Sequence, residues 1–191
     1  ELVGVCGTNT GHEDMPDSSP GILQPPPKPR VPELLIAASA KKMGIQAVPM
    51  HRAVLTRPKD DRMACFYATP CGSGCSIGAA FQTTTSLLPM AKATGNLKVI
   101  TDAMVKSVKV DEQGKVTGVT YVDKHTVTEH AIDADVVILA ASACESARIL
   151  LNSKNKKHPK GLANSSGQVG RNLMDSTGAW LGAQIPALKG R

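Results

Sequence analysis

The second half of the chain carries the clearest alternation of apolar and polar residues. Residues 97–101 read as a strand, and residues 103–110 alternate with a period of two, which is typical of a strand with one face on a core. A turn at 111–114, with glycine near its end, leads to a second alternating run at 116–122. A further strand at 127–132 completes the pattern. These residues therefore predict an antiparallel meander.

Residues 134–141 break this alternation. Their sequence, A-D-V-V-I-L-A-A, is apolar on both faces, as expected of a strand covered by a layer on each side. Ser142 and Glu145 then fit a capping box that opens a helix reaching residue 151. The small residues at 140–143 permit two interpretations. They let the backbone approach a ligand at the carboxyl end of a strand, or they only pack helix against strand.

The first half of the chain is less regular. Residues 7–32 are rich in Gly, Asp, Ser and Pro and predict an extended surface segment. Residues 32–43 form an apolar run that opens with proline and is followed by Gly44, which predicts a helix of about three turns. We expect a short strand at 45–49 and a helix at 81–94, although an internal proline strains the helix.

Composition narrows the classes of function. Apolar residues make up 41% of the chain and aromatic residues only 3%, so a core must be built from aliphatic side chains. The net charge is +6, and positive charge is densest at residues 154–160. This stretch contains no aromatic residue, which argues against nucleic-acid binding. It is typical of a solvated loop. No apolar run is long enough to cross a membrane, and no signal peptide is visible. The chain begins at Glu1 instead of Met, which suggests a piece of a longer protein.

Three of the five cysteines lie close together in sequence. Cys65, Cys71 and Cys75 have the spacing C-x5-C-x3-C, with glycines between the last two. Three thiolates from one short loop suit an iron–sulfur cluster with three cysteine-held irons, or an incomplete zinc site. The alternatives are structural thiols, with Cys71 and Cys75 as a local disulfide, or another metal. Cys6 and Cys144 read as small buried hydrophobic residues.

The histidines provide no candidate for a catalytic residue. All five are scattered, and neither a His-Glu-x-x-His zinc pattern nor a Ser/His/Asp order occurs. His125 and His130 lie near a predicted hairpin turn, where we expect them to face solvent.

Several motifs, in order, resemble one enzyme family. They are Val105, residues 118–123, residues 136–153 and residues 161–175. The last two are similar to the patterns V-I-L-A-A-G-A followed by S-x-R-L-L-L-x-S, and G-L-x-N-x-x-x-V-G-R-N-L-x-D-H, of glucose–methanol–choline (GMC) FAD-dependent oxidoreductases. Two positions depart from these patterns, with Ser142 in place of the usual glycine and Ser176 in place of the final histidine. The resemblance covers about residues 1 to 176 and is closest to bacterial sugar and polyol dehydrogenases with a cysteine-bearing loop.

This resemblance implies a fold and a set of cofactor contacts. We expect an α/β (mixed α+β) fold: a partial FAD-binding domain with an antiparallel meander, plus part of a substrate or cap domain. The expected organisation is a cysteine-loop and cap-side segment at 1–95, FAD-domain residues at 96–176, and the start of another segment at 177–191. By resemblance, Val105 places its backbone against the flavin's adenine. The residues that line the dinucleotide are Ala140, Ala141, Ser142 and Ala143.

The resemblance also implies a reaction. The parent enzyme would oxidise the hydroxyl group of an alcohol, sugar or polyol, with FAD as the hydride acceptor. Electrons would pass to oxygen, to a quinone, or through a 3Fe–4S cluster held by Cys65, Cys71 and Cys75 to a cytochrome. The resemblance does not fix the cellular compartment: a cluster-bearing dehydrogenase would be periplasmic, and otherwise the protein would be cytoplasmic.

Two motifs that such an enzyme needs are not found in these 191 residues. No Gly-x-Gly-x-x-Gly follows a strand, and no carboxy-terminal His-Asn or His-His pair occurs. We therefore expect the chain to be inactive in isolation. The alternative is a non-catalytic iron–sulfur or partner-binding module.

Overall fold

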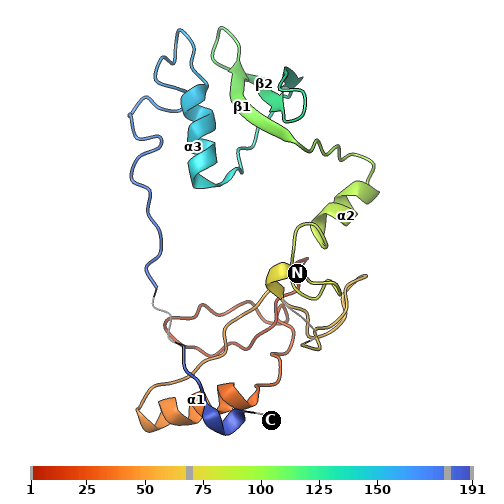
Figure 1. The fold of residues 1–191 in the computed structure, drawn as a ribbon, viewed down its shortest axis with the longest axis vertical. Helices are drawn as coiled ribbons and strands as arrows, with labels where there is room; N and C mark the ends of the chain where they lie inside the picture. Colours follow the sequence, from red (N-terminus) through yellow and green to blue (C-terminus); the bar gives the residue numbers. More distant parts are fainter. Residues whose placement is uncertain (1, 68–70, 179–181, 190–191) are drawn as a thin grey trace. The chain divides into compact units, whose positions relative to one another are not determined.

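The computed structural model describes residues 2–67, 71–178 and 182–189. The chain forms two compact units, residues 1–98 and residues 99–191. Both helices and a sheet are present (Figure 1), so the expected mixed α/β fold is confirmed. Among the described residues, no helix combines the length and the apolar character needed to cross a membrane.

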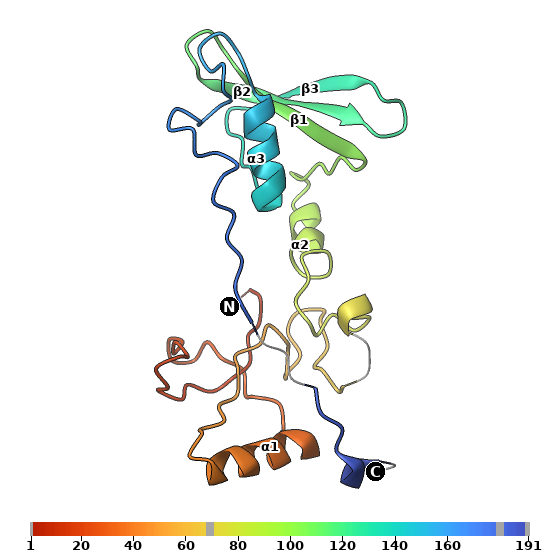
Figure 2. The same cartoon turned by 60° about the vertical axis from the view of Figure 1, so that its left-hand side comes forward.

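The second unit is built on a three-stranded antiparallel sheet, which confirms the predicted meander. Its strands are β1 (Ala103–Val110), β2 (Val116–Asp123) and β3 (Glu129–Asp133), in the order β1-β2-β3. Figure 2 shows them side by side. Gly118 is required at its position in β2, because its φ is +149° and a Cβ there would lie 2.0 Å from the Ile132 carbonyl oxygen.

The helix α3 (Ser142–Asn152) packs against β1 and closes the core of this unit. Val108 from β1, Ile149 from α3 and Leu162 from the following loop are buried together. Six half-buried aliphatic residues surround them: Val105, Val110, Val116, Val137, Leu139 and Leu150. The core is thus aliphatic, as the low aromatic content requires.

The prediction of a doubly covered strand at 134–141 is wrong for this structure. Val137 and Leu139 pack on the core, but the side chains on the other face are open, with Val136 74% and Ile138 84% exposed. No strand is assigned there, because no described segment pairs with residues 136–140. The strand expected at 97–101 is absent for the same reason. A strand is stabilised by its neighbours, which a local pattern does not contain.

The capping box predicted at Ser142 is also wrong. The N-cap of α3 is Ala141, with no side-chain cap, and Ser142 is the first helical residue. Glu145 instead forms an ion pair with Arg148, one turn further along α3, at 2.8 Å.

The first unit contains α1 (Val31–Lys42), a short 3-10 turn at Cys71–Ser73 and α2 (Leu87–Ala93). The helix α1 matches its prediction to within one residue. The helix α2 begins six residues later than expected, which places its proline in the first turn, where a missing N–H has no effect on the helix. The strand expected at 45–49 is not formed. A further 3-10 turn, Pro186–Leu188, lies in the carboxy-terminal segment.

Candidate functional site

The predicted dinucleotide-lining residues form one continuous open surface in the second unit. Ala140 and Ala141 end the extended segment, while Ser142 and Ala143 begin α3, and all four residues are exposed. Their side chains carry at most one atom beyond Cβ. A ligand can therefore approach the backbone here, next to the amide groups at the amino terminus of α3.

Val105, the predicted adenine contact, lies in β1 and is tied to α3 by a hydrogen bond. The Arg148 guanidinium donates from Nη2 to the Val105 carbonyl oxygen at 2.8 Å, and from Nε to Glu145 Oε2 at 2.9 Å. The pairing of β1 with β2 is irregular at this point, with a register shift between Val105 and Ser107. Such bulges are frequent beside functional sites. The role of Arg148 toward Val105 is not indicated by the sequence, although the spacing of Arg148 from Glu145 is typical of an ion pair within a helix.

Ser142 has a strained backbone. Its φ is +68°, in the left-handed region that costs a residue with a Cβ about 1–2 kcal/mol. This is the position where the family pattern has glycine. The exchange of glycine for serine is therefore small in volume but not neutral in conformation.

A second feature, in the first unit, is the loop that ends at Cys75. This residue is 8% exposed, and its sulfur accepts a hydrogen bond from the Ala80 N–H at 3.4 Å. That bond, with weaker contributions from the backbone N–H groups of residues 77–79, lowers the pKa of the Cys75 thiol. These N–H groups therefore favour the thiolate form of Cys75, which is the form of cysteine that binds metals.

The loop is fixed by a buried arginine. Arg62 is 7% exposed and donates to three carbonyl groups, those of Gly78 at 2.8 Å, Val3 at 2.9 Å and Ala79 at 3.4 Å. Leu55 N–H also donates to the Ala79 carbonyl at 2.9 Å. The residues that follow Cys75 are thus held in place from two sides. Sequence patterns did not indicate this role, because a single arginine in an irregular region carries no periodic signal.

The structure does not bring the three cysteines of the predicted metal site together. Cys65 accepts a hydrogen bond from Tyr67 N–H at 3.4 Å, and Cys71 begins the 3-10 turn. Residues 68–70, between them, lie outside the described part of the chain. Among the described residues, no group of three or more metal-binding side chains is close enough to hold a metal ion. The metal site therefore stays a prediction.

The other cysteine predictions can be compared directly with the structure. Cys75 forms no disulfide, so the alternative of a local disulfide between Cys71 and Cys75 is wrong. Cys6 is buried as expected, and burial raises its pKa. Cys144 is exposed, which contradicts the expectation that it is buried, because it lies on the open side of α3. His125 and His130 face solvent, as predicted.

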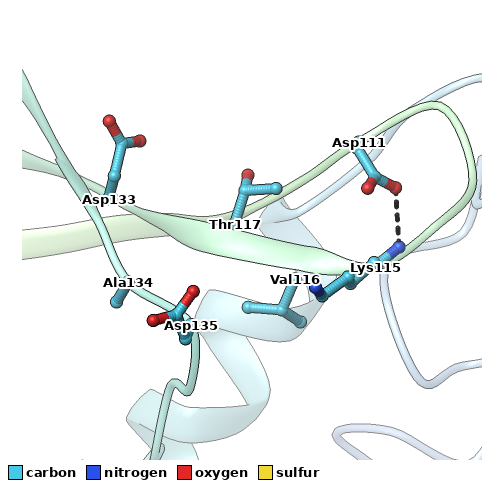
Figure 3. A pocket seen from close by; sticks show the side chains of 7 residues that line it. All are labelled: Asp111, Lys115, Val116, Thr117, Asp133, Ala134 and Asp135. Atoms are coloured by element: carbon cyan, nitrogen blue, oxygen red, sulfur yellow. Dashed lines mark hydrogen bonds between the residues drawn. The ribbon is translucent and has the colours of Figure 1, made fainter.

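An open hollow of about 400 Å³ lies beside the β1–β2 turn (Figure 3). Asp111 accepts a hydrogen bond from Lys115 N–H at 2.8 Å, and Asp133 pairs with Lys109 at 2.6 Å. These carboxylates therefore stabilise the turn and the sheet. The hollow shares no residue with the dinucleotide-lining surface.

A match to a family model decides the family. The model described as GMC oxidoreductase matches residues 25–177, which is most of the chain. This chain belongs to the GMC oxidoreductase family. The match includes both β1 and α3, so the surface at 140–143 lies within it.

Individual relatives agree with this assignment. The chain is 35% identical over 173 residues to a 2-methyl-1,2-propanediol dehydrogenase from Mycolicibacterium austroafricanum, covering 91% of this chain and 31% of the relative. It is 31% identical over 143 residues to the fructose dehydrogenase large subunit of Gluconobacter japonicus, covering 75% and 26%. It is 29% identical over 188 residues to a 6'''-hydroxyparomomycin C oxidase from Streptomyces lividus, covering 97% and 34%. The chain thus spans between a quarter and about a third of the length of these relatives.

Proposed function

We propose that this chain is part of an FAD-dependent enzyme that oxidises the hydroxyl group of an alcohol or sugar. The match to the GMC oxidoreductase family over residues 25–177 carries this proposal. The names of two relatives, a diol dehydrogenase and a fructose dehydrogenase subunit, support the substrate class. FAD would supply the acceptor for the hydride that leaves the substrate carbon.

The residues proposed to contact FAD are Val105 and the four small residues at 140–143. Three observations fit this role. The four side chains are small and exposed, the first amide groups of α3 have no side-chain cap, and Arg148 fixes the backbone of Val105. An uncapped helix amino terminus favours a negatively charged group, as a dinucleotide has. This chain would therefore bind and orient one side of the cofactor.

We propose that the chain alone does not turn over substrate. The glycine motif that grips the pyrophosphate in such enzymes and the histidine pair that accepts the hydroxyl proton are not found in its sequence, so these residues would supply only part of the cofactor site and no catalytic base. The proposed domain organisation is a cysteine-loop and cap-side segment at 1–95, FAD-binding residues at 96–176, and the start of a further segment at 177–191.

A titration with FAD tests the cofactor surface. We expect the purified chain to quench FAD fluorescence with a measurable dissociation constant. Ala143→Glu should weaken binding at least about tenfold, because a carboxylate then faces the dinucleotide phosphates. An acidic residue in the first turn of α3 favours the helix, so loss of binding would not reflect unfolding. Ala131→Glu, on exposed β3, is the matched control.

Two outcomes would contradict the cofactor proposal. One is a chain that shows no FAD binding at millimolar concentration. The other is equal affinity in the wild-type chain and Ala143→Glu.

We further propose that Cys65, Cys71 and Cys75, which lie apart in this structure, come together around a 3Fe–4S cluster that passes electrons to a cytochrome. The lowered pKa of Cys75 supports a ligand role for this residue. The alternative function, a non-catalytic iron–sulfur or partner-binding module, gains no support from these three relatives, which are named as enzymes or enzyme subunits.

Anaerobic reconstitution with iron and sulfide tests the cluster. We expect brown absorbance and about three irons per chain, both lost in Cys75→Ser and retained in Cys144→Ser, which changes an exposed cysteine of α3. A wild-type chain that takes up no iron would rule out a cluster.

A further inference from the structure

The proposed cofactor surface is built from two elements that are distant in sequence. Val105 lies in β1, whereas the four small residues at 140–143 lie at the start of α3 and just before it. A ligand that contacts both parts binds more tightly when their spacing is fixed in advance, since otherwise it must order the protein as it binds. The contacts that fix this spacing therefore bear on cofactor affinity.

One side chain joins the two elements beside this surface. Arg148, in the second turn of α3, donates from Nη2 to the Val105 carbonyl oxygen at 2.8 Å, across 43 positions of sequence. Helical side chains lean toward the amino terminus of their helix, so the guanidinium lies over the first turn of α3. Figure 2 shows α3 lying against the sheet that contains β1.

Val105 lies at a point where the strand pairing is interrupted. The register of β1 against β2 shifts between Val105 and Ser107, with Lys106 as the extra residue. A bulge of this kind breaks the regular ladder of backbone hydrogen bonds and lets the strand bend. The hydrogen bond from Arg148 thus holds the backbone where the ladder itself holds it least.

Arg148 is itself held in position. One carboxylate oxygen of Glu145, Oε2, lies 2.9 Å from its Nε and 2.8 Å from its Nη2. Because the guanidinium is planar and rigid, contacts to two of its nitrogens fix its orientation. Its side chain is 32% exposed, so these bonds are partly shielded from water. The orientation is therefore set by α3 and passed on to the Val105 carbonyl group.

A second hydrogen bond joins the same two elements at the far end of α3. Ser153 Oγ accepts from the Val108 N–H at 2.8 Å, and Ser153 is 4% exposed. Ser153 follows Ser142 by eleven residues, or roughly 15 Å along a helix axis. This bond therefore stabilises the packing of α3 on β1 without bordering the cofactor surface.

From these contacts, we propose that Arg148 is a positioning residue for the adenine half of the cofactor. It fixes the bulge at Val105 relative to the start of α3, so that both parts of the surface meet the dinucleotide without rearrangement. Arg148 acts through the Val105 backbone. This inference rests on the proposed function, because it concerns the same surface.

Titrations with FAD and with ADP test the proposal. ADP carries the adenine half without the flavin, and its affinity follows from the FAD fluorescence that it restores by displacement. We expect Arg148→Gln to raise both dissociation constants by the same factor, about three- to tenfold, because the bulge must then be ordered as the ligand binds. Glutamine is a good helix former, so α3 should persist, which circular dichroism would confirm.

Two further variants separate positioning from other effects. Ser153→Ala removes the other bond between α3 and β1 and should change both dissociation constants by less than about twofold, at a temperature where circular dichroism shows the chain folded. Glu145→Gln combined with Arg148→Gln tests for a charge effect, because loss of the arginine alone leaves a carboxylate unpaired near the phosphates. This double variant should still bind at least about threefold more weakly than the wild type.

Each result of these titrations bears on the proposal. Equal weakening of FAD and ADP in Arg148→Gln, kept in the double variant and absent in Ser153→Ala, would support it. Unchanged affinity in Arg148→Gln would overturn it, as would weaker binding of FAD alone, recovery in the double variant, an equal loss in Ser153→Ala, or ADP that does not displace FAD from the wild type. In all these cases the wild-type chain binds FAD and the proposed function stands. A wild-type chain that binds no FAD would contradict the proposed function and this inference with it.

Discussion

At the scale of single residues, Ser142 is the position where sequence and backbone disagree. Its φ of +68° suits glycine, and it begins the helix that carries the proposed cofactor surface. We expect Ser142→Gly to raise the free energy of unfolding of the second unit by about 1 kcal/mol, because the left-handed strain is removed. Urea unfolding followed by circular dichroism measures this change.

The control for this prediction lies in the same helix. Ser146 has ordinary helical neighbours in α3, so Ser146→Gly should lower the free energy of unfolding by about 0.5 kcal/mol. The same sign of change in both variants would show that backbone strain at Ser142 is not the cause.

Ser153, just past the end of α3, joins that helix to β1. It is 4% exposed; its Oγ donates to the Ile149 carbonyl at 2.6 Å and accepts from Val108 N–H at 2.8 Å. We expect Ser153→Ala to cost about 1–3 kcal/mol in the free energy of unfolding, because the buried Val108 N–H loses its partner. Urea unfolding measures this. Ser146→Ala is the control, because Ser146 lies inside α3 and forms no side-chain hydrogen bond with the described residues, so stability should change by less than about 0.5 kcal/mol.

At the scale of elements, the β2–β3 hairpin has a turn that depends on one carboxylate. Asp123 accepts hydrogen bonds from the N–H groups of His125 and Thr126 and from the Thr126 hydroxyl. These bonds, those from Thr126 above all, hold the pKa of Asp123 below its ordinary value of 3.8. A depressed pKa means that the stabilisation is complete above pH 3.8 and is lost as the pH falls through the folded-state pKa.

We therefore expect the turn to loosen in acid. NMR titration should show the amide signals of His125 and Thr126 moving together below about pH 4. In Asp123→Asn, whose amide oxygen can still accept these bonds without titrating, that movement should disappear. Glu112→Gln removes a carboxylate from the neighbouring hairpin turn and should leave the movement of the His125 and Thr126 signals unchanged. If the wild-type signals stayed constant down to pH 2, the carboxylate would not support the turn.

The elements that could be predicted from sequence are those whose stabilising contacts are local. The helix α1 has proline near its start and glycine just past its end, and these residues mark its limits. The strands of the meander are marked by period-two runs separated by short turns. The segments at 45–49, 97–101 and 134–141 have equally apolar sequences but form no strand. Each would need a hydrogen-bonding neighbour, and the sequence of a segment does not state whether one is near.

At the scale of the whole molecule, the chain exposes more surface than its mass predicts. Its accessible surface is 14847 Å², whereas two compact domains that share 20.0 kDa would expose about 10500 Å² together. The helix α1 illustrates the excess, because none of its residues is buried and its apolar side chains Leu34, Leu35 and Ile36 are exposed. Apolar side chains of a helix normally face a core.

This excess leads to a prediction about where stability resides. Ile149→Ala should lower the free energy of unfolding by about 2–5 kcal/mol, because Ile149 is 3% exposed and lies in the core of the second unit. Ile36→Ala, the same change in α1 at a residue 61% exposed, should cost less than about 1 kcal/mol. Urea unfolding measures the free energy of unfolding of both variants. An equal loss of stability in the two variants would show that α1 is covered in solution.

The sequence by itself determined the family, the meander, the aliphatic core and the positions of two helices, because each of these depends on motif order, periodicity or local punctuation. Only the tertiary structure decided that Arg148 and Ser153 connect α3 to β1, that Arg62 fixes the loop after Cys75, and that residues 136–140 are covered on one face alone. Those features join residues that are distant in sequence. They depend on which backbone groups remain unpaired after folding, and no local pattern records that.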